Sequence, residues 1–467
     1  MTLLKPAGLP MTDEQWMQSP YAHPLSLNGG DANGIKSFKG EASAPFVPSV
    51  QAALNYDKWG FQFAFGLVGG GGKCTFNRGL GSFERQVALL PSILQLANNT
   101  YQQQYGIDLG LGSNTPGYSV ESYIHGQQYV FGFQFGSTYK VNENLAVYGG
   151  FRFNYIYNKY EGSISNITVN INGQNENLYS YLGTKADALA NQALSYQEQA
   201  SNYTRLAQEA TLAGNEQAAQ QYAAAAEQLT KGAQLAQGGA QAIGGVRSQV
   251  ADRNLDCTQR GWGITPIIGV DYRWGKLNLG ARLEFTTHLN IENDTKVDDT
   301  GLFADGVNTP NDIPGILTVG GCYEILPTWR VMASYHYYFD KDARMDKDKQ
   351  KLLSSNTWEW ALGSEYDISD ALTVSAGMQR TKYGLGDGSY LTDMSFTTSS
   401  YSYGFGAKVR VAPKVTVEAS YFWTNYETFD KEYDQEYSAA GMSAKAHNTD
   451  QFTRTNKVFG VGVNLDF

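Results

Sequence analysis

The last eleven residues of this chain are the feature that most constrains its fold. Phe459, Val461, Val463, Leu465 and Phe467 occupy alternate positions, and small or polar residues stand between most of them. Because successive side chains of a strand point to opposite faces, these five residues lie on one face of a strand. A strand that is apolar outside, small or polar inside, and ends on an aromatic residue is typical of a bacterial outer-membrane barrel. Phe467 is therefore expected to be recognised by the barrel assembly machinery.

The same alternation recurs through most of the chain. From Leu277 to Ile291 the odd positions are mostly apolar, whereas the even positions are small or polar and include Arg282, Glu284 and His288. Similar patterns run over 329–339, 401–411 and 415–423. Spans of ~9–11 residues with one apolar face are what tilted transmembrane strands need. The odd face is predicted to meet lipid and the even face to line the lumen.

Turn residues divide the chain into strands. Short connections are predicted at 56–58, 141–144, 273–276, 326–327, 367–370 and 412–414. Longer polar connections are predicted at roughly 29–44, 70–117, 171–260, 296–312, 343–354, 386–396 and 430–451. Short periplasmic turns alternating with long external loops are expected of an outer-membrane barrel. The sequence predicts an all-β fold, a 14-stranded antiparallel transmembrane β-barrel over 21–467 with helical extracellular loops.

Composition agrees with a barrel and excludes other classes. Of 467 residues, 42% are apolar, but no run approaches the ~18 consecutive apolar residues of a membrane helix. Aromatic residues reach 13% and glycines number 51, which suits interfacial girdles and crowded inward positions. The net charge of −10 argues against a nucleic-acid partner. Three cysteines form no metal-binding spacing, and a Cys74–Cys257 disulfide between two external loops stays an open possibility.

Two external loops, at 70–117 and 171–260, are predicted to contain helices. Residues from about 184 to 249 are rich in Ala, Gln and Glu and predict a helical hairpin, which serves as a spacer or as a partner surface. In the loop at 70–117, Phe83, Val87, Leu90 and Leu94 share one face at helical spacing. Pro91 is expected to kink or split this helix at Leu90. The apolar face either covers the barrel rim or binds an apolar ligand.

No catalytic or metal-binding arrangement stands out, so the sequence predicts neither an enzyme nor a cofactor. The five histidines lack metal-ligand spacing, and none of the common catalytic motifs is present. Among the inward charges, Arg152 and Arg282 are the candidates to hold a ligand carboxylate by charge-assisted hydrogen bonds. The alternative is that they neutralise inward acids, because an unpaired charge inside a narrow barrel is costly.

Several short motifs resemble the FadL family of outer-membrane transporters for long-chain fatty acids and other hydrophobic compounds. The segment from Lys5 to Leu9 is similar to the family's Asn-Pro-Ala-Gly segment after its plug, with Lys5 in place of Asn. Further similarities lie at 44–48, 56–61, 261–263 and 312–314 and at the terminal Phe467. Because the chain starts at the first of these motifs, residues 1–20 are expected to be a remnant of a truncated N-terminal plug, without a signal peptide.

The resemblance implies a passive, monomeric transporter in the bacterial outer membrane, in contact with outer-membrane lipid. An apolar solute such as a long-chain fatty acid would bind among the external loops, enter a pocket in the lumen and leave sideways through the wall. Gly66 to Gly72 would supply the gap, or would be only a flexible exit into the loop. The alternative function is a docking or shuttle protein of a secretion system, which stable co-purification without an apolar ligand would favour. A general porin is disfavoured, because porins typically use about 16–18 strands.

Overall fold

The computed structural model describes residues 1–467 except 6–10, 20, 21, 23, 24, 26, 32–34, 106–116, 172, 440 and 441. Residues 6–9 of the N-terminal motif thus lie outside the described residues. The helices are α1 (Asp13–Met17), α2 (Gly81–Tyr105), α3 (Leu178–Leu212) and α4 (Glu216–Gln249), with 3₁₀ turns η2 (Asp340–Asp342) and η3 (Asp346–Leu352). No helix within the described ranges is long and apolar enough to cross a membrane.

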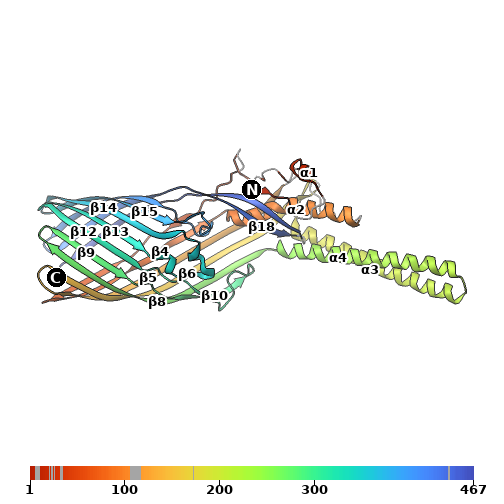
Figure 1. Ribbon diagram of the computed structural model, residues 1–467, viewed down its shortest axis with the longest axis horizontal. Coiled ribbons are helices and arrows are strands. Elements are labelled where there is room, and N and C mark those ends of the chain that lie inside the picture. The colour runs from red at the N-terminus through yellow and green to blue at the C-terminus, as the bar shows by residue number, and fades with distance from the viewer. Residues whose placement is uncertain are drawn as a thin grey trace.

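The structure is mostly β, and its strands are β1 (Thr2–Leu3), β2 (Glu41–Ser43), β3 (Val50–Tyr56), β4 (Trp59–Phe76), β5 (Tyr118–Lys140), β6 (Leu145–Ile171), β7 (Gln174–Asn177), β8 (Arg253–Trp274), β9 (Leu277–Glu284), β10 (Asn290–Asp298), β11 (Asn308–Pro310), β12 (Ile316–Leu326), β13 (Trp329–Tyr338), β14 (Ser355–Ser369), β15 (Leu372–Gly384), β16 (Ser400–Ala412), β17 (Val415–Tyr426), β18 (Phe429–Ala439), β19 (Met442–Phe452) and β20 (Thr455–Leu465). Figure 1 shows most of them wrapped into a barrel with the C-terminus at one end and α3 and α4 projecting from the other, while β1, β19 and β18 form a separate sheet.

One antiparallel ladder makes the barrel wall. Its strands, in order, are the thirteen strands β3, β4, β5, β6, β8, β9, β12, β13, β14, β15, β16, β17 and β20. All six predicted short turns join neighbours in this ladder at the end that holds the C-terminus, called here the short-turn end. The opposite end, called the loop end, carries the long connections. Within the described residues no register joins β20 back to β3.

The predicted count of fourteen strands is not reached in the part of the chain that the structure describes. The missing strand was expected before the connection at 29–44. Instead, β1 pairs with β19 at the loop end, with Thr2 opposite His447, and α1 follows it. The physical reason is apolar burial: Leu3 and Trp16 are buried in the apolar core of the loop end.

The inner and outer faces of the wall follow the predicted alternation. The Nη2 of Arg282 on β9 donates to Oε1 of Gln134 on β5 over 3.1 Å, although β6 and β8 separate these strands, so both side chains lie inside the barrel. On the outer face Phe459, Val461 and Val463 of β20 are exposed. Exposed outward aromatic residues lie near both borders of this apolar surface, as in an interfacial girdle: Trp59, Trp274, Trp329 and Tyr366 near the short turns, and Trp262, Phe285 and Tyr401 toward the loop end.

The alternation predicted for 277–291 is wrong beyond Glu284. Ile267 pairs with Glu284 but Arg260 pairs with Glu292, so the strand that follows β9 contains one extra residue, a β-bulge. After this bulge Leu289 and Ile291 are buried inside with Ile156, and His288 faces outward. Gly263 is needed opposite the bulge, because a Cβ there would come within 2.6 Å of Thr287 Cγ2.

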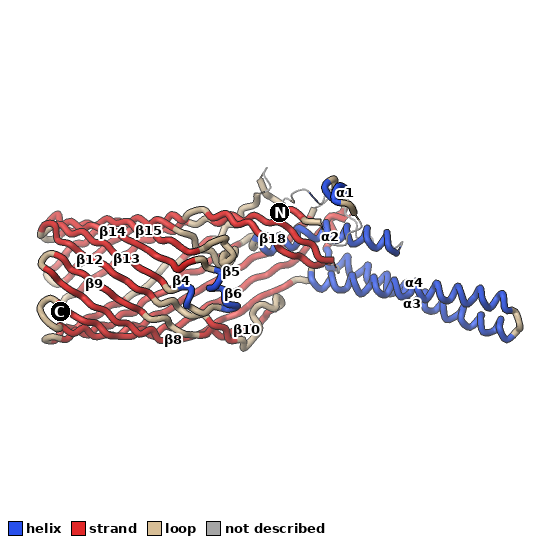
Figure 2. The backbone as a smooth tube through the Cα atoms, viewed as in Figure 1, coloured by secondary structure: helices blue, strands red, loops and turns tan. Residues whose placement is uncertain are grey.

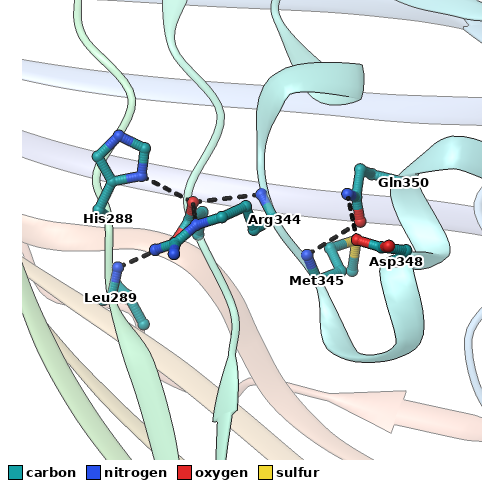
Figure 3. Close-up of polar contacts among 7 residues, drawn as sticks. His288, Leu289, Arg344, Met345, Asp348 and Gln350 are labelled. Atoms are coloured by element: carbon teal, nitrogen blue, oxygen red, sulfur yellow. Dashed lines mark hydrogen bonds and ion pairs between the residues drawn. The ribbon is translucent and has the colours of Figure 1, made fainter.

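The outward side of this bulge is stabilised by one buried carboxylate, Asp312. Its oxygens accept hydrogen bonds from His288 Nδ1 at 2.8 Å, Leu289 N at 3.0 Å and Arg344 Nε at 2.9 Å (Figure 3). Burial by itself would raise the pKa of Asp312, but the hydrogen bonds from Arg344 and His288 bring it below its ordinary value. The carboxylate therefore joins the connection after β13 to the wall just beyond the apolar surface.

The loop end holds the largest apolar core of the described residues. Strands β4, β5, β6 and β8 continue past the length that a membrane requires, and α2 packs against β5, β6 and β18. Figure 2 shows α2 beside the base of the long helical hairpin. The core contains Leu89 and Leu94 of α2, Val169 of β6, Leu182 of α3 and Ile243 of α4.

Helices α2, α3 and α4 agree with the predicted elements, with one correction. The helical hairpin expected at about 184–249 corresponds to α3 and α4, which begin and end near those bounds. The expectation that Pro91 splits the other helix is wrong, because Pro91 lies inside the single helix α2. Proline removes one backbone hydrogen bond, and burial of Leu89, Leu90, Ile93 and Leu94 on both sides of it compensates for that loss.

Asp312→Asn is expected to destabilise the wall near His288 by about 1–3 kcal/mol, because hydrogen bonds to a buried charged acceptor are weakened. The folded-state pKa is below the unfolded value of roughly 3.9, so this contribution is present above about pH 4 and is lost as pH falls through the folded pKa. Tryptic cleavage at Arg344 of the folded barrel should increase in the variant at pH 7. Equal cleavage rates in the variant and the parent would contradict this role of Asp312.

Candidate functional site

An apolar cavity of about 450 Å³ opens among the loop-end elements. On α2 it is lined by Phe83, Val87, Leu90 and Ile93. The remaining walls come from β5, β6, the start of β8, the connection after β10 and β18, and include Ile124, Ile164, Leu255, Phe303 and Tyr437. Apolar lining with a few polar groups, Gln86, Gln249, Arg253 and Gln435 among them, is the usual make-up of a small-molecule site. This space is called the outer cavity below.

Helix α2 is fixed in place by polar contacts of its first turn. The carboxylate of Glu84 accepts hydrogen bonds from Lys36 Nζ at 2.6 Å and from the Tyr118 hydroxyl at 2.7 Å. Arg85 forms an ion pair with Asp450 of β19 and donates to the Tyr433 hydroxyl on β18. Burial is the main cause that raises the pKa of Tyr433, to about 12. These contacts orient the apolar face of α2 toward the outer cavity.

A second cavity of about 600 Å³ lies inside the barrel toward the short-turn end. Its lining is mixed, and its polar side chains include Gln62, Gln134, Tyr148, Asn278 and Arg282. It is called the inner cavity below. Cys322 also lines this cavity.

Strand β6 relates the two cavities to one another. Gly162 and Ile164 line the outer cavity and Tyr148 lines the inner cavity. At about 3.3 Å per residue, the fourteen steps from Gly162 to Tyr148 span roughly 45 Å. Between them the inward side chains of Arg152, Asn154, Ile156 and Asn158 are all buried. The barrel interior along β6 is therefore packed between the two cavities.

The packed interior contains an ion-pair cluster around Glu284. Arg152 Nη2 lies 2.7 Å from one oxygen of this carboxylate, and Arg282 Nη2 lies 2.6 Å from the other. Arg152 also donates from Nε to Asn154 Oδ1 over 3.0 Å, and Asn154 donates to Thr265 over 2.8 Å. Two cations share one carboxylate, so the cluster keeps one positive charge. Arg282 is the more accessible cation, at 39% side-chain exposure against 11% for Arg152.

The six residues expected to bind ligand therefore fall into two separate places. Phe83, Val87 and Leu90 line the outer cavity, whereas Leu94 of the same face is buried in the apolar core of the loop end. Arg152 and Arg282 lie in the barrel around Glu284, and Arg282 also lines the inner cavity.

The hydrogen-bond ladder of the wall is interrupted beside the glycine run of β4. Residues 59–65 of β4 pair with β3, and residues 73–75 pair with β2. The intervening residues 66–72 have no register with either strand, and on their other side the β4–β5 ladder shifts twice, after Leu67 and after Gly70. This stretch of β4 is called the wall interruption below. Val68 points inward here: a Cβ on Gly132 would lie 2.7 Å from Val68 Cγ1 and 2.9 Å from Arg152 Cδ.

The cysteines are free thiols, so the Cys74–Cys257 disulfide does not form. Cys74 lies on β4 opposite Gly126 of β5, and Cys257 lies on β8 opposite Tyr160 of β6. Strands β5 and β6 separate the two.

Sequence reasoning missed Glu84, Arg85 and Phe303. Glu84 and Arg85 are two adjacent charged residues inside an apolar helical pattern. This position indicates that their side chains are buried and paired with groups of opposite charge or with hydrogen-bonding groups. Phe303 follows Leu302 in an otherwise polar connection between Gly301 and Gly306. An apolar pair in such a loop indicates that the loop packs against something.

The comparisons with known proteins agree with this architecture. Residues 289–467 match the family model described as "Outer membrane protein beta-barrel domain". No curated protein matches the chain in sequence.

Similar solved structures include a Pseudomonas aeruginosa FadL homologue, 10% identical, which covers 90% of this chain and 77% of that chain with a TM-score of 0.48. The Pseudomonas putida toluene transporter TodX is 13% identical over 92% of this chain and 86% of that chain, with a TM-score of 0.44. The CymD monoaromatic hydrocarbon channel is 12% identical over the same shares, with a TM-score of 0.39.

Glu284→Gln is expected to destabilise the barrel by about 3–5 kcal/mol, because it leaves the buried Arg152 without its counter-charge. Arg282→Ala is expected to cost less, since Arg152 and Glu284 remain paired. The measurement is denaturant unfolding of the refolded barrel, followed by tryptophan fluorescence. Equal midpoints for the two variants would contradict the shared ion pair.

Proposed function

We propose that this protein is a passive outer-membrane transporter of hydrophobic small molecules, with long-chain fatty acids as the first candidate cargo. The observation that supports it best is the outer cavity, whose lining contains three of the four α2 residues expected to bind ligand. Its volume lies within the roughly 300–1,000 Å³ of small-molecule sites. The match of residues 289–467 to an outer-membrane β-barrel domain supports the location.

The proposed path starts in the outer cavity and leaves through the wall interruption. The buried side chains from Arg152 to Asn158 fill the interior along β6, which favours a lateral route. By the registers, Gly69 of β4 lies opposite Val130 of β5, and Val130 lies opposite Ile156 of β6, which places the wall interruption at the level of this packed region. Lateral release also keeps the cargo out of water, which would cost about 0.8 kcal/mol per exposed CH₂.

The Glu284 cluster supports a cargo with a carboxylate. It keeps one positive charge, and Arg282 has side-chain surface free to approach an anion beside the inner cavity. Arg152 is the weaker candidate for this role, because it is buried and already paired on Nη2 and Nε.

A docking role remains the second candidate, and the helical hairpin favours it. Helices α3 and α4 project beyond the loop end, and most of their length is exposed to solvent. Two results together would favour docking. A secretion complex would co-purify stably with the protein and be lost when residues 184–245 are replaced by a short Gly-Ser turn, and apolar ligands would show no saturable binding.

Phe83→Ala is expected to weaken binding of a fluorescent long-chain fatty acid by about tenfold, because an apolar side chain is removed from the cavity wall. Binding is measured as saturable fluorescence change on the refolded protein in detergent. Gln102→Glu is the matched control, since Gln102 is exposed on the same helix α2. No saturable binding by the parent protein would remove the transport proposal, and equal affinity of both variants would move the site elsewhere.

Gly132→Leu is expected to slow fatty-acid entry into proteoliposomes while binding in the outer cavity is kept, because the new side chain occupies the space beside Val68 and Arg152 at the wall interruption. Gly149→Leu is the control, since a Cβ there meets nothing within 4 Å. Entry is followed with a pH dye inside the vesicles. Unchanged entry in a folded Gly132→Leu protein would exclude the wall interruption as the route.

A further inference from the structure

Two aromatic rings meet at the floor of the outer cavity. The ring centroids of Tyr160 on β6 and Phe303 in the connection after β10 are 5.3 Å apart, at an interplanar angle of 33°. Tyr160 lies opposite Cys257 of β8, and Cys257 lies opposite Thr295 of β10. The contact between the two rings therefore spans β8 and β10 on the inner face of the wall. Cys257 of β8, which lies under the two rings, is fully buried.

The ring pair lies between the outer cavity and the wall interruption. Phe303 lines the outer cavity, as does Gly162, the next inward residue of β6 above Tyr160. Tyr160 accepts a hydrogen bond from Gln128 Nε2 at 2.5 Å, and Gln128 is opposite Gly72 of β4. A solute that moves from the outer cavity along β6 toward residues 66–72 therefore passes this pair.

Several hydrogen bonds attach the segment that carries Phe303, among them one from Thr295 N to Asp305 Oδ1 over 2.9 Å. The Asp298 carboxylate accepts from the backbone N–H groups of Thr300 and Phe303, at 3.0 and 2.8 Å. The Thr295 hydroxyl donates to the Phe303 carbonyl over 2.6 Å, and Asn293 donates to the Ala304 carbonyl over 3.1 Å.

The backbone at both ends of this segment is left-handed. Gly301 and Gly306 both have φ +71°, which glycine adopts without strain. A rotation of the segment about these two glycines would require the contacts of Asp298, Thr295 and Asn293 to break.

We propose that Phe303 determines which apolar solutes pass from the outer cavity into the barrel. Its contact with Tyr160 limits the cross-section of the solute that can pass. This inference rests on the proposed transport function. Separating two rings costs about 0.5–1.5 kcal/mol, and a slim alkyl chain replaces the lost contact with its own. A wide rigid solute has to displace the segment itself and so breaks the contacts of Asp298, Thr295 and Asn293. The constriction thus favours linear solutes over polycyclic ones of equal carbon number.

The first test compares entry of a linear carboxylic acid and a rigid polycyclic carboxylic acid of the same carbon number into proteoliposomes. Phe303→Ala is expected to raise the entry rate of the polycyclic acid, relative to that of the linear acid, by about tenfold. Phe285→Ala is the matched control, because Phe285 is an aromatic residue exposed on the outer face. Binding of the linear acid in detergent is measured on each variant as the readout of the outer cavity.

The second test fixes the segment. Cys74, Cys257 and Cys322 are first replaced by serine, and Asn293→Cys and Ala304→Cys are then combined in that protein. The two new cysteines should form a disulfide in place of the hydrogen bond between Asn293 and Ala304. Oxidation is expected to stop entry of the polycyclic acid, and dithiothreitol should restore it. Each single cysteine variant is the control.

The results of these two tests distinguish a failure of the role of Phe303 from a failure of the proposed transport function. If the parent protein neither binds nor admits either acid, transport itself is wrong. If the parent admits the linear acid, but Phe303→Ala and the disulfide leave the rates of both acids unchanged, transport stands and the role of Phe303 is overturned. Increased entry of both acids to the same extent would also overturn it, since Phe303 would then act without selecting by shape.

Discussion

The pairing of backbone polar groups inside the wall is the constraint on which the rest of this structure depends. A lipid bilayer offers no partners for an N–H or a C=O, so a chain that crosses it as strands has to pair them with neighbouring strands. The ladder from β3 to β20 does this with short turns at one end. Long connections at the other end are then free to form helices and a core of their own.

That freedom explains why the molecule has its apolar core outside the barrel. Inside the barrel the inward faces are largely polar, and Asn158, Gln259 and Asn293 form a hydrogen-bonded chain across β6, β8 and β10. At the loop end, by contrast, α2, the base of the hairpin and β19 bury leucine, isoleucine and valine side chains together. The outer cavity lies where these two environments meet, so it has apolar walls next to a polar interior.

Much of the fold could be predicted from the sequence because alternation and turn composition are local signals. The six short turns and the outward face of β20 are read directly from neighbouring residues. The strand expected before the connection at 29–44, in contrast, is replaced by β1 and α1, because Leu3 and Trp16 find more burial at the loop end. The bulge after Glu284 has no local signal either, since Thr287 and His288 are compatible with either face.

The site was predictable only in part for the same reason. Helical spacing is enough to group Phe83, Val87 and Leu90, but the burial of Leu94 depends on what covers it. The polarity of Arg152 and Arg282 predicts an inward position, whereas their shared partner Glu284 depends on the register between β6, β8 and β9. Phe303 becomes informative only when its segment is seen to reach Tyr160 across two strands.

The number of strands in the ladder has a consequence for how its two ends can meet. In a strictly alternating series of thirteen, the first and last strands run in the same direction, so β3 and β20 are parallel to each other. Every other neighbour in the wall is antiparallel. A direct junction between them would have slanted hydrogen bonds that are somewhat weaker per residue. A further strand between β3 and β20, running opposite to both, would instead form antiparallel hydrogen bonds with each of them. The number of strands in the wall would then be even.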